Sequence, residues 1–214
     1  MNTFRRWKVF FNIVVMLSLL TSSCSFASQV KVIIFDCDGT LVDSMPIHME
    51  AWIKAFHDFG GPYHDEFLDP LKGMPEEEIV RIYNQQFGCS FNPKIIVDRK
   101  HDYFQKKLHR IKPIQPVVDV VMKFADKLKM AVVSGGRRVN VLGTLDGIGI
   151  REYFSVILTA DDPVPSKPAP DVFIEAARLL KIQPKFCQVF EDGDIGLEAA
   201  RKAGMVVTDI RKYV

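Results

Sequence analysis

The chain has 214 residues, which is enough for one domain with a sizeable core or for a core with a smaller insert. Its hydrophobic content of 48% and charged content of 25% are ordinary for a globular protein. The formal net charge is +2, but three of the basic residues lie in the first eight positions, and the chain from residue 28 onward carries 25 basic and 26 acidic side chains. Nothing in this balance argues for a protein that binds nucleic acid or an anionic membrane surface.

Residues 1–27 have the pattern of an export signal. The basic stretch "MNTFRRWK" precedes the twelve-residue apolar stretch "VFFNIVVMLSLL", and small residues follow before Ser28. Because the apolar stretch is short for a transmembrane helix, we expect cleavage and an exported protein, periplasmic or secreted. An uncleaved membrane anchor and a lipid-modified Cys24 remain alternatives.

The cysteines beyond the signal do not form a recognisable pattern. Cys37, Cys89 and Cys187 are odd in number, and their spacings match neither a zinc site nor a disulfide framework. We expect each to be a small buried hydrophobe, with Cys37 pointing away from its acidic neighbours. A disulfide between Cys37 and Cys187 stays open for an exported protein.

Short β-branched runs alternate with helical patterns over most of the chain. The predicted strands are 29–36, 130–136, 154–160, 187–192 and 205–210. The predicted helices are 116–129, 170–181 and 194–204, with Asp194 as the expected N-cap of the last. The alternation predicts an α/β core, a parallel sheet with right-handed crossovers.

The stretch after the first strand breaks this alternation. Amphipathic helical patterns cover 46–60, 74–88 and 92–111, without a strand pattern. They predict a helical domain at 46–112 inserted into a core made of 28–45 and 113–214. Asp43 is expected to shape the turn into the insert.

Polar residues follow each predicted strand. Asp36 and Asp38 end the first strand on one side of it, since side chains alternate with period two. The other strands deliver Ser134-Gly135-Gly136, Lys167 and Glu191-Asp192. Parallel sheets bind ligands beyond the carboxyl ends of their strands, carboxylates suit Mg²⁺, and lysine and hydroxyl groups suit phosphate oxygens. Asp161 and Asp162 are interpreted as loop acids.

Four motifs occur in order within residues 32–205: "DCDGTLVDS", "VVSGG", "SKPAPDVF" and "VFEDGDIGLEAARKAGM". This set resembles the haloacid dehalogenase (HAD) superfamily of phosphohydrolases, and within it the β-phosphoglucomutase-like branch with its sugar-phosphate phosphatases. The resemblance implies a Rossmann-like core with a helical cap inserted after the first strand.

The resemblance also implies roles for single residues. Asp36 would be the nucleophile that forms a phospho-aspartate, and Asp38 the general acid and then the base. Asp36, the backbone carbonyl of Asp38 and Asp192 would ligate Mg²⁺, with Glu191 ligating it or holding a metal-bound water. The residues that would bind or orient the phosphoryl group are Ser134, Lys167, Gly39, Thr40 and Gly135.

In the cap, Lys72 and Gly73 resemble the specificity loop of that branch. Glu76 stands where true β-phosphoglucomutases carry an arginine that grips a distal phosphate, and we expect it to repel a second phosphate. His48 either supports Asp38 or is an ordinary surface histidine.

We therefore expect a Mg²⁺-dependent phosphoric monoester hydrolase acting on small phosphorylated metabolites, sugar phosphates above all. A helical cap suits a small substrate and excludes water, and neither a nucleic acid partner nor an oligomer is expected. The alternatives are a phosphosugar mutase and, from a different class, a catalytically silent phosphometabolite-binding protein. A dehalogenase is disfavoured by Asp38, Gly39 and Thr40.

Overall fold

The computed structural model describes residues 30–62, 65–71 and 74–214, so the predicted signal, Lys72 and Gly73 lie outside the described residues. The chain forms two compact units. Among the described residues, one contains 30–43 together with Lys112–Val214, and the other lies within Ser44–Ile111. These limits lie within two residues of the boundaries predicted from the sequence.

The first unit is built on a parallel sheet. Its strands are β1 (Val32–Phe35), β4 (Lys129–Val133), β5 (Val156–Leu158), β6 (Cys187–Glu191) and β7 (Val206–Asp209). Their order is β5-β4-β1-β6-β7, and every neighbouring pair is parallel. The central strands β1 and β6 are buried along their whole length, which explains their near-continuous apolar sequences. The predicted α/β fold is confirmed.

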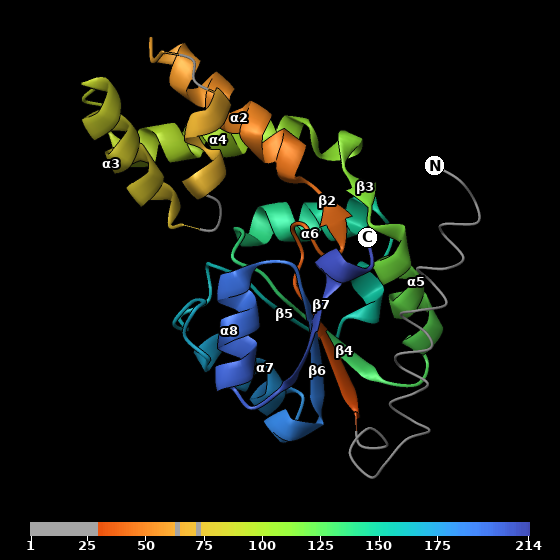
Figure 1. Ribbon diagram of the computed structural model, residues 1–214. Helices are drawn as coiled ribbons and strands as arrows, with labels where there is room; N and C mark the ends of the chain where they lie inside the picture. Colours follow the sequence, from red (N-terminus) through yellow and green to blue (C-terminus); the bar gives the residue numbers. More distant parts are fainter. Residues whose placement is uncertain (1–29, 63–64, 72–73) are drawn as a thin grey trace. The chain divides into compact units, whose positions relative to one another are not determined.

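Helices cover both faces of this sheet (Figure 1). They are α5 (Gln115–Phe124), α6 (Arg138–Gly147), α7 (Asp171–Leu179) and α8 (Asp194–Lys202), with the 3-10 turns η5 (Arg151–Tyr153), η6 (Pro184–Phe186) and η7 (Ile210–Lys212). Right-handed crossovers place α5 and α6 on one face and α7 and α8 on the other. Val32 and Ile34 of β1 pack with Phe173 of α7 and Ala199 of α8 in one apolar cluster.

Helix α6 was not predicted, because its sequence lacks an apolar stripe. It contains two glycines, and its buried side chains include the polar Asn140 and Thr144. A helix whose buried face is partly polar gives a weak periodic signal.

The prediction that Asp194 caps α8 is wrong. Gly193 is the N-cap, Asp194 is the first helical residue, and its carboxylate accepts a hydrogen bond of 2.8 Å from Arg211 Nη2. The carboxylate of Glu191 already accepts the backbone N–H of Gly193 at 2.9 Å. The helix entry therefore gets its acidic partner from the end of β6.

A small antiparallel pair, β2 (Val42–Asp43) and β3 (Lys112–Pro113), lies where the chain leaves the first unit and returns to it. Asp43 stands opposite Lys112 in this pair, so it belongs to a strand and not to a free turn. Two-residue strands give no periodic pattern, and the sequence did not predict them.

The second unit is helical, as predicted. It contains α2 (Met45–Asp58), α3 (Glu76–Phe87) and α4 (Pro93–Lys106), with the 3-10 turns η2 (Asp65–Phe67), η3 (Asp69–Leu71) and η4 (Leu108–Arg110). An aromatic cluster forms its core, in which Phe56 and Tyr83 stack with ring centroids 3.7 Å apart. The Asn92 side chain caps α4 by accepting from the Ile95 N–H.

The described cysteines are free, and Cys37 and Cys187 are buried. Cys187 lies opposite Val32 at the start of the strands, whereas Cys37 follows the end of β1. At roughly 3.3 Å per residue the two are about 16 Å apart along the strands, too far for a disulfide.

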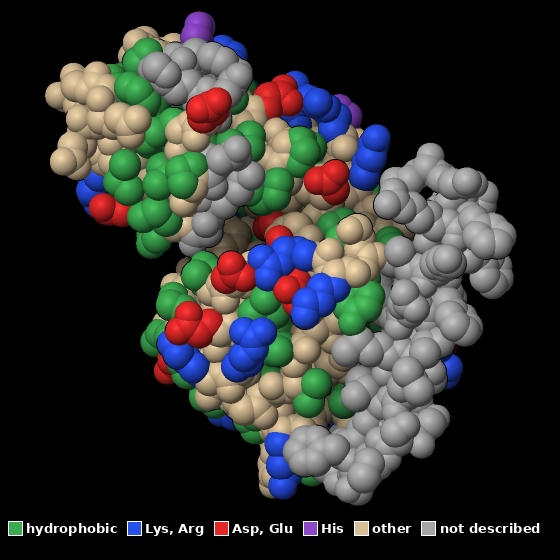
Figure 2. All heavy atoms as spheres, viewed as in Figure 1, with side chains coloured by type: hydrophobic (Ala, Val, Ile, Leu, Met, Phe, Trp, Pro, Cys, Tyr) green, Lys and Arg blue, Asp and Glu red, His purple; other side chains and the backbone are tan. Residues whose placement is uncertain are grey.

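Over the described residues, no helix is both long enough and apolar enough to cross a membrane. On the face drawn in Figure 2, acidic and basic side chains are interspersed and do not gather by sign.

Candidate active site

The site lies at the carboxyl ends of β1 and β6. Asp36 directly follows β1, its backbone N–H donates to the Phe190 carbonyl at 3.0 Å, and Glu191 and Asp192 stand at the end of β6. The chain leaves β1 for β4 on one side, while β6 is its neighbour on the other. Acids from two strands therefore meet at the switch point of the sheet, where open α/β folds bind ligands.

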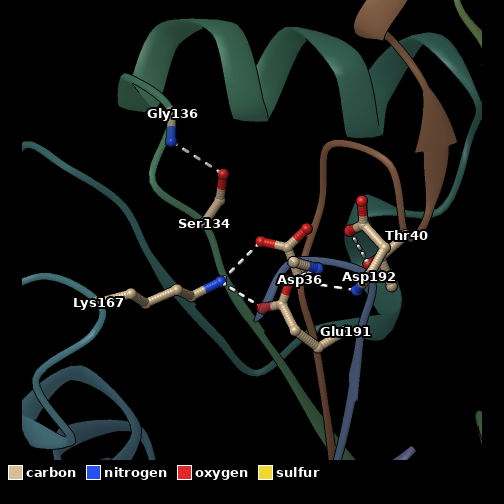
Figure 3. A network of polar contacts seen from close by, with 8 residues as sticks. Asp36, Thr40, Ser134, Gly136, Lys167, Glu191 and Asp192 are labelled. Carbon is tan, nitrogen blue, oxygen red and sulfur yellow. Dashed lines mark hydrogen bonds and ion pairs between the residues drawn. The ribbon is translucent and has the colours of Figure 1, made fainter. Parts of the chain in front are cut away.

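Asp36, Glu191 and Asp192 form an acidic cluster (Figure 3). Each presents a carboxylate oxygen, and these oxygens lie within 4.8 Å of one another. Burial and the charge of Glu191 raise the pKa of Asp36. Burial also raises the pKa of Asp192, with Glu191 adding to the rise and a hydrogen bond from Thr40 opposing it. These hard oxygen donors suit Mg²⁺, and a divalent cation would relieve their mutual repulsion.

Lys167 joins two of these acids. Its Nζ donates to Asp36 Oδ1 at 2.7 Å and to Glu191 Oε2 at 2.7 Å (Figure 3). Burial alone would lower the pKa of Lys167, but the charges of Asp36 and Glu191 outweigh it, and the pKa rises. The structure thus keeps a lysine cation beside Asp36, the carboxylate that the family resemblance implies as nucleophile.

Glu191 is held tightly in place. Its Oε1 accepts the backbone N–H groups of Asp192 at 3.2 Å and Gly193 at 2.9 Å. Helix α8 passes so close that a Cβ at Gly196 would lie 2.1 Å from Glu191 Oε2. Since Glu191 is committed to Lys167 and to backbone donors, its first task is to hold the lysine.

Gly39 and Thr40 fix the position of the Asp192 carboxylate. The Thr40 hydroxyl, fully buried, donates to Asp192 Oδ1 at 2.8 Å. Gly39 has φ +87, and a Cβ there would lie 2.3 Å from Asp192 Oδ2. The family resemblance implied that Thr40 helps to orient the phosphoryl group; in the structure its hydroxyl positions the carboxylate of Asp192.

Asp38 and Ser134 converge on the turn after β4. Ser134 is buried, and its Oγ accepts the Gly136 N–H at 3.0 Å. A Cβ at Gly136 would lie 3.3 Å from both Asp38 Oδ2 and Ser134 Oγ, while Gly135 is exposed in the same turn. Among the described acids, the carboxylate cluster does not include Asp38. Asp36 therefore belongs to the carboxylate cluster, whereas Asp38 lies with Ser134 at the turn after β4.

The residues predicted in the cap belong to the second unit. The His48 ring stacks on Phe104 with centroids 4.1 Å apart, and Lys72 and Gly73 lie outside the described residues.

Glu76 differs from the expectation of a repelling charge. Its Oε1 accepts from Lys100 Nζ at 2.6 Å and its Oε2 contacts His101 Nε2 at 2.6 Å. Because Lys100 is only 2% exposed, the lysine charge offsets that of Glu76 in a shielded setting, and Glu76 repels an anion less than the sequence suggested. The sequence did not identify Lys100 and His101 as partners of Glu76, because they lie on a different helix and their spacing in the sequence indicates no contact with it.

Comparisons with known proteins point to one family. Residues 33–210 match the family described as haloacid dehalogenase-like hydrolase. The chain is 34% identical over 180 residues to "Fructose-1-phosphate phosphatase YqaB" of Escherichia coli (strain K12), covering 84% of this chain and 95% of that protein. It is 24% identical over 189 residues to "Beta-phosphoglucomutase" of Bacillus subtilis (strain 168), covering 84% and 83%.

Among solved structures, CbbY from Rhodobacter sphaeroides in complex with phosphate matches with a TM-score of 0.75 at 24% identity, over 83% of this chain and 84% of that chain. This similarity supports the fold.

Proposed function

Since the chain belongs to the haloacid dehalogenase-like hydrolase family, we propose that it is a Mg²⁺-dependent phosphatase of small phosphorylated metabolites, with sugar phosphates as substrates. The prediction of a phosphatase of this family is confirmed by the family match and by a relative named as a phosphatase. The observation that carries the proposal is the contact of Lys167 with Asp36 beside the acidic cluster.

The donor set fits a hard dication. Asp36, Asp192 and Glu191 would surround it, and Thr40 and Gly39 fix the carboxylate of Asp192 for that task. When bound, Mg²⁺ supplies positive charge that offsets the repulsion between the carboxylates and an incoming phosphate.

Asp36 would attack the phosphorus atom. Its carboxylate oxygen forms a bond to phosphorus as the bond to the sugar oxygen breaks, and the departing oxygen takes a proton from Asp38. In the second step a water gives its proton to Asp38 and attacks the same phosphorus, which breaks the bond to Asp36 and releases inorganic phosphate. Lys167 lies close enough to Asp36 to offset charge on the transferring group.

The turn after β4 would bind the phosphoryl oxygens. The Ser134 hydroxyl accepts from Gly136 and can donate its own proton to an oxygen of the substrate. Asp38 reaches the same turn, so the acid and the phosphate-binding hydroxyl serve one substrate group.

A phosphosugar mutase is the second candidate, because one relative is named "Beta-phosphoglucomutase". Against it stands the lack of an arginine at the position that resembles the one in the mutases: Glu76 occupies it and is paired with Lys100, so this position offers no arginine to a second phosphate. A silent binding protein is disfavoured because Asp36 and Lys167 are both present and in contact.

The deciding experiment incubates the purified chain and Mg²⁺ with a panel of sugar phosphates, fructose 1-phosphate and β-glucose 1-phosphate among them. We expect release of inorganic phosphate. Conversion of one sugar phosphate into an isomer without release would favour the mutase, and binding without either reaction would favour the silent protein.

We also propose export, which rests on residues 1–27 alone. Cell fractionation with mass analysis of the mature N-terminus would separate cleavage near Ser28 from an uncleaved anchor.

A further inference from the structure

The turn that carries Ser134 is tied to the loop after β5. The Gly136 carbonyl accepts the Ala160 N–H at 3.0 Å, and Asp161 Oδ2 accepts the Arg138 N–H at 2.8 Å. The Ser134 N–H in turn donates to the Leu158 carbonyl at 2.9 Å. The position of the Ser134 turn therefore depends on residues 158–161.

A side-chain pair reinforces this tie. Arg138 Nη2 lies 2.7 Å from both Oδ1 and Oδ2 of Asp162, and 3.4 Å from the Ile157 carbonyl. Asp162 Oδ2 also accepts from the backbone N–H of Thr159 at 2.8 Å and from its hydroxyl at 3.0 Å. One carboxylate thus binds the start of α6 and the end of β5 at once.

The same loop runs on to Lys167. The Val164 N–H donates to the Asp162 carbonyl at 2.7 Å, and three residues later the chain delivers Lys167 to Asp36. Asp162 therefore lies between the two elements that would grip the phosphoryl group, the Ser134 turn and the lysine.

We propose that Arg138 and Asp162 are positioning residues, which hold the Ser134 turn and the Lys167 loop in register for phosphate binding; this inference rests on the proposed function. The pair touches no reacting atom. It acts through the Ser134 turn, and an error of about 1 Å in such a group can cost on the order of a hundredfold in rate.

Helix α6 offers a matched control. Near its other end, Arg151 Nη1 pairs with Asp146 Oδ2 at 2.9 Å, with both side chains about half exposed. This second arginine–aspartate pair forms no contact with the 134–138 turn or the 159–162 loop among its described hydrogen bonds.

The test compares Arg138→Gln, Asp162→Asn, the double variant and Arg151→Gln. Affinity for inorganic phosphate is measured by calorimetry with Mg²⁺ present, KM and kcat with the best sugar phosphate, and thermal unfolding in parallel. We expect each of the two single variants to weaken phosphate affinity and raise KM about tenfold, with cooperative unfolding retained. The double variant should lose no more phosphate affinity than the more affected single variant, because both substitutions break the same contact. Arg151→Gln should match the unaltered chain.

Phosphate affinities within about twofold of the unaltered chain, or losses that add in the double variant, would overturn the positioning role. Loss of phosphate affinity only together with loss of cooperative unfolding would also overturn it, by making the pair a stability element. An unaltered chain that binds phosphate but hydrolyses no sugar phosphate would contradict the proposed function, while the calorimetry would still decide on Arg138 and Asp162.

Discussion

The hydroxyl of Thr40 donates a 2.8 Å hydrogen bond to Asp192 across 152 positions of sequence. This bond joins the loop after β1 to the loop after β6 and opposes the rise in the pKa of Asp192 that burial causes. It therefore favours the charged form of Asp192, which is the form that binds a divalent cation.

Thr40→Val should weaken Mg²⁺ activation. The variant keeps the shape of the side chain but loses the donor, so the charged form of Asp192 becomes less favourable. A hydrogen bond to a charged group is worth about 1.5–3 kcal/mol, and we expect the Mg²⁺ concentration for half-maximal phosphate release to rise about tenfold or more. Thr40→Ser keeps the hydroxyl and should stay near the unaltered chain. An unchanged Mg²⁺ requirement in Thr40→Val would show that the bond does not tune the site.

Gly196→Ala should destabilise the protein although alanine favours helices. The added Cβ would lie 2.1 Å from Glu191 Oε2, so either α8 or Glu191 must move. A shift of Glu191 would also disturb its ion pair with Lys167. Overpacking of this kind costs about 1–3 kcal/mol, more than the gain of up to about 1 kcal/mol in helix propensity. Urea unfolding measures the difference.

Gly147→Ala is the matched control for that experiment. Gly147 also lies in a helix, and a Cβ there would meet nothing within 4 Å. We expect unchanged or slightly higher stability. Equal effects of the two substitutions would mean that Glu191 has room to move.

The second unit should lose stability in acid. Contacts with His101 and Lys100 outweigh burial and lower the pKa of Glu76 from 4.5 to about 2. A carboxyl with a lowered folded-state pKa stabilises the fold above its unfolded value and loses this contribution as pH falls from about 4.5 to about 2. The contribution at neutral pH is on the order of 3 kcal/mol.

The fluorescence of Trp52, which lies in the second unit, reports this loss during denaturant unfolding at pH 7 and at pH 3. Glu76→Gln should flatten the pH dependence. A variant with the same slope between these pH values as the unaltered chain would assign the acid sensitivity to other groups.

The sequence predicted the acidic cluster because each of its members directly follows a strand pattern that can be read from the sequence. Asp36 follows a buried apolar run, and Glu191 and Asp192 follow another, so strand pairing alone brings them together. Hydrogen-bond and ion-pair partners that depend on tertiary packing could not be predicted from the sequence. Nothing in the spacing of Thr40 and Asp192 announces their hydrogen bond, and helical patterns cannot say which face of one helix meets another.

The missed elements have similar causes. Helix α6 buries Asn140 and Thr144 among apolar residues, so its periodicity is weak. Asp194 has the chemistry of an N-cap, but the N-cap is one residue earlier, at Gly193, whose backbone N–H donates to Glu191. A contact with the end of β6 therefore sets the start of the helix, and the preference of aspartate for the N-cap position does not.

We propose that Asp36, the member of the acidic cluster that contacts Lys167, accepts the phosphoryl group. Phosphate release from a sugar phosphate by Asp36→Asn, compared with the unaltered chain at saturating Mg²⁺, tests it most directly. The amide keeps the size of the side chain but cannot attack phosphorus, so we predict a loss of about a thousandfold or more with cooperative unfolding retained. A folded Asp36→Asn variant that releases phosphate at the normal rate would contradict the claim.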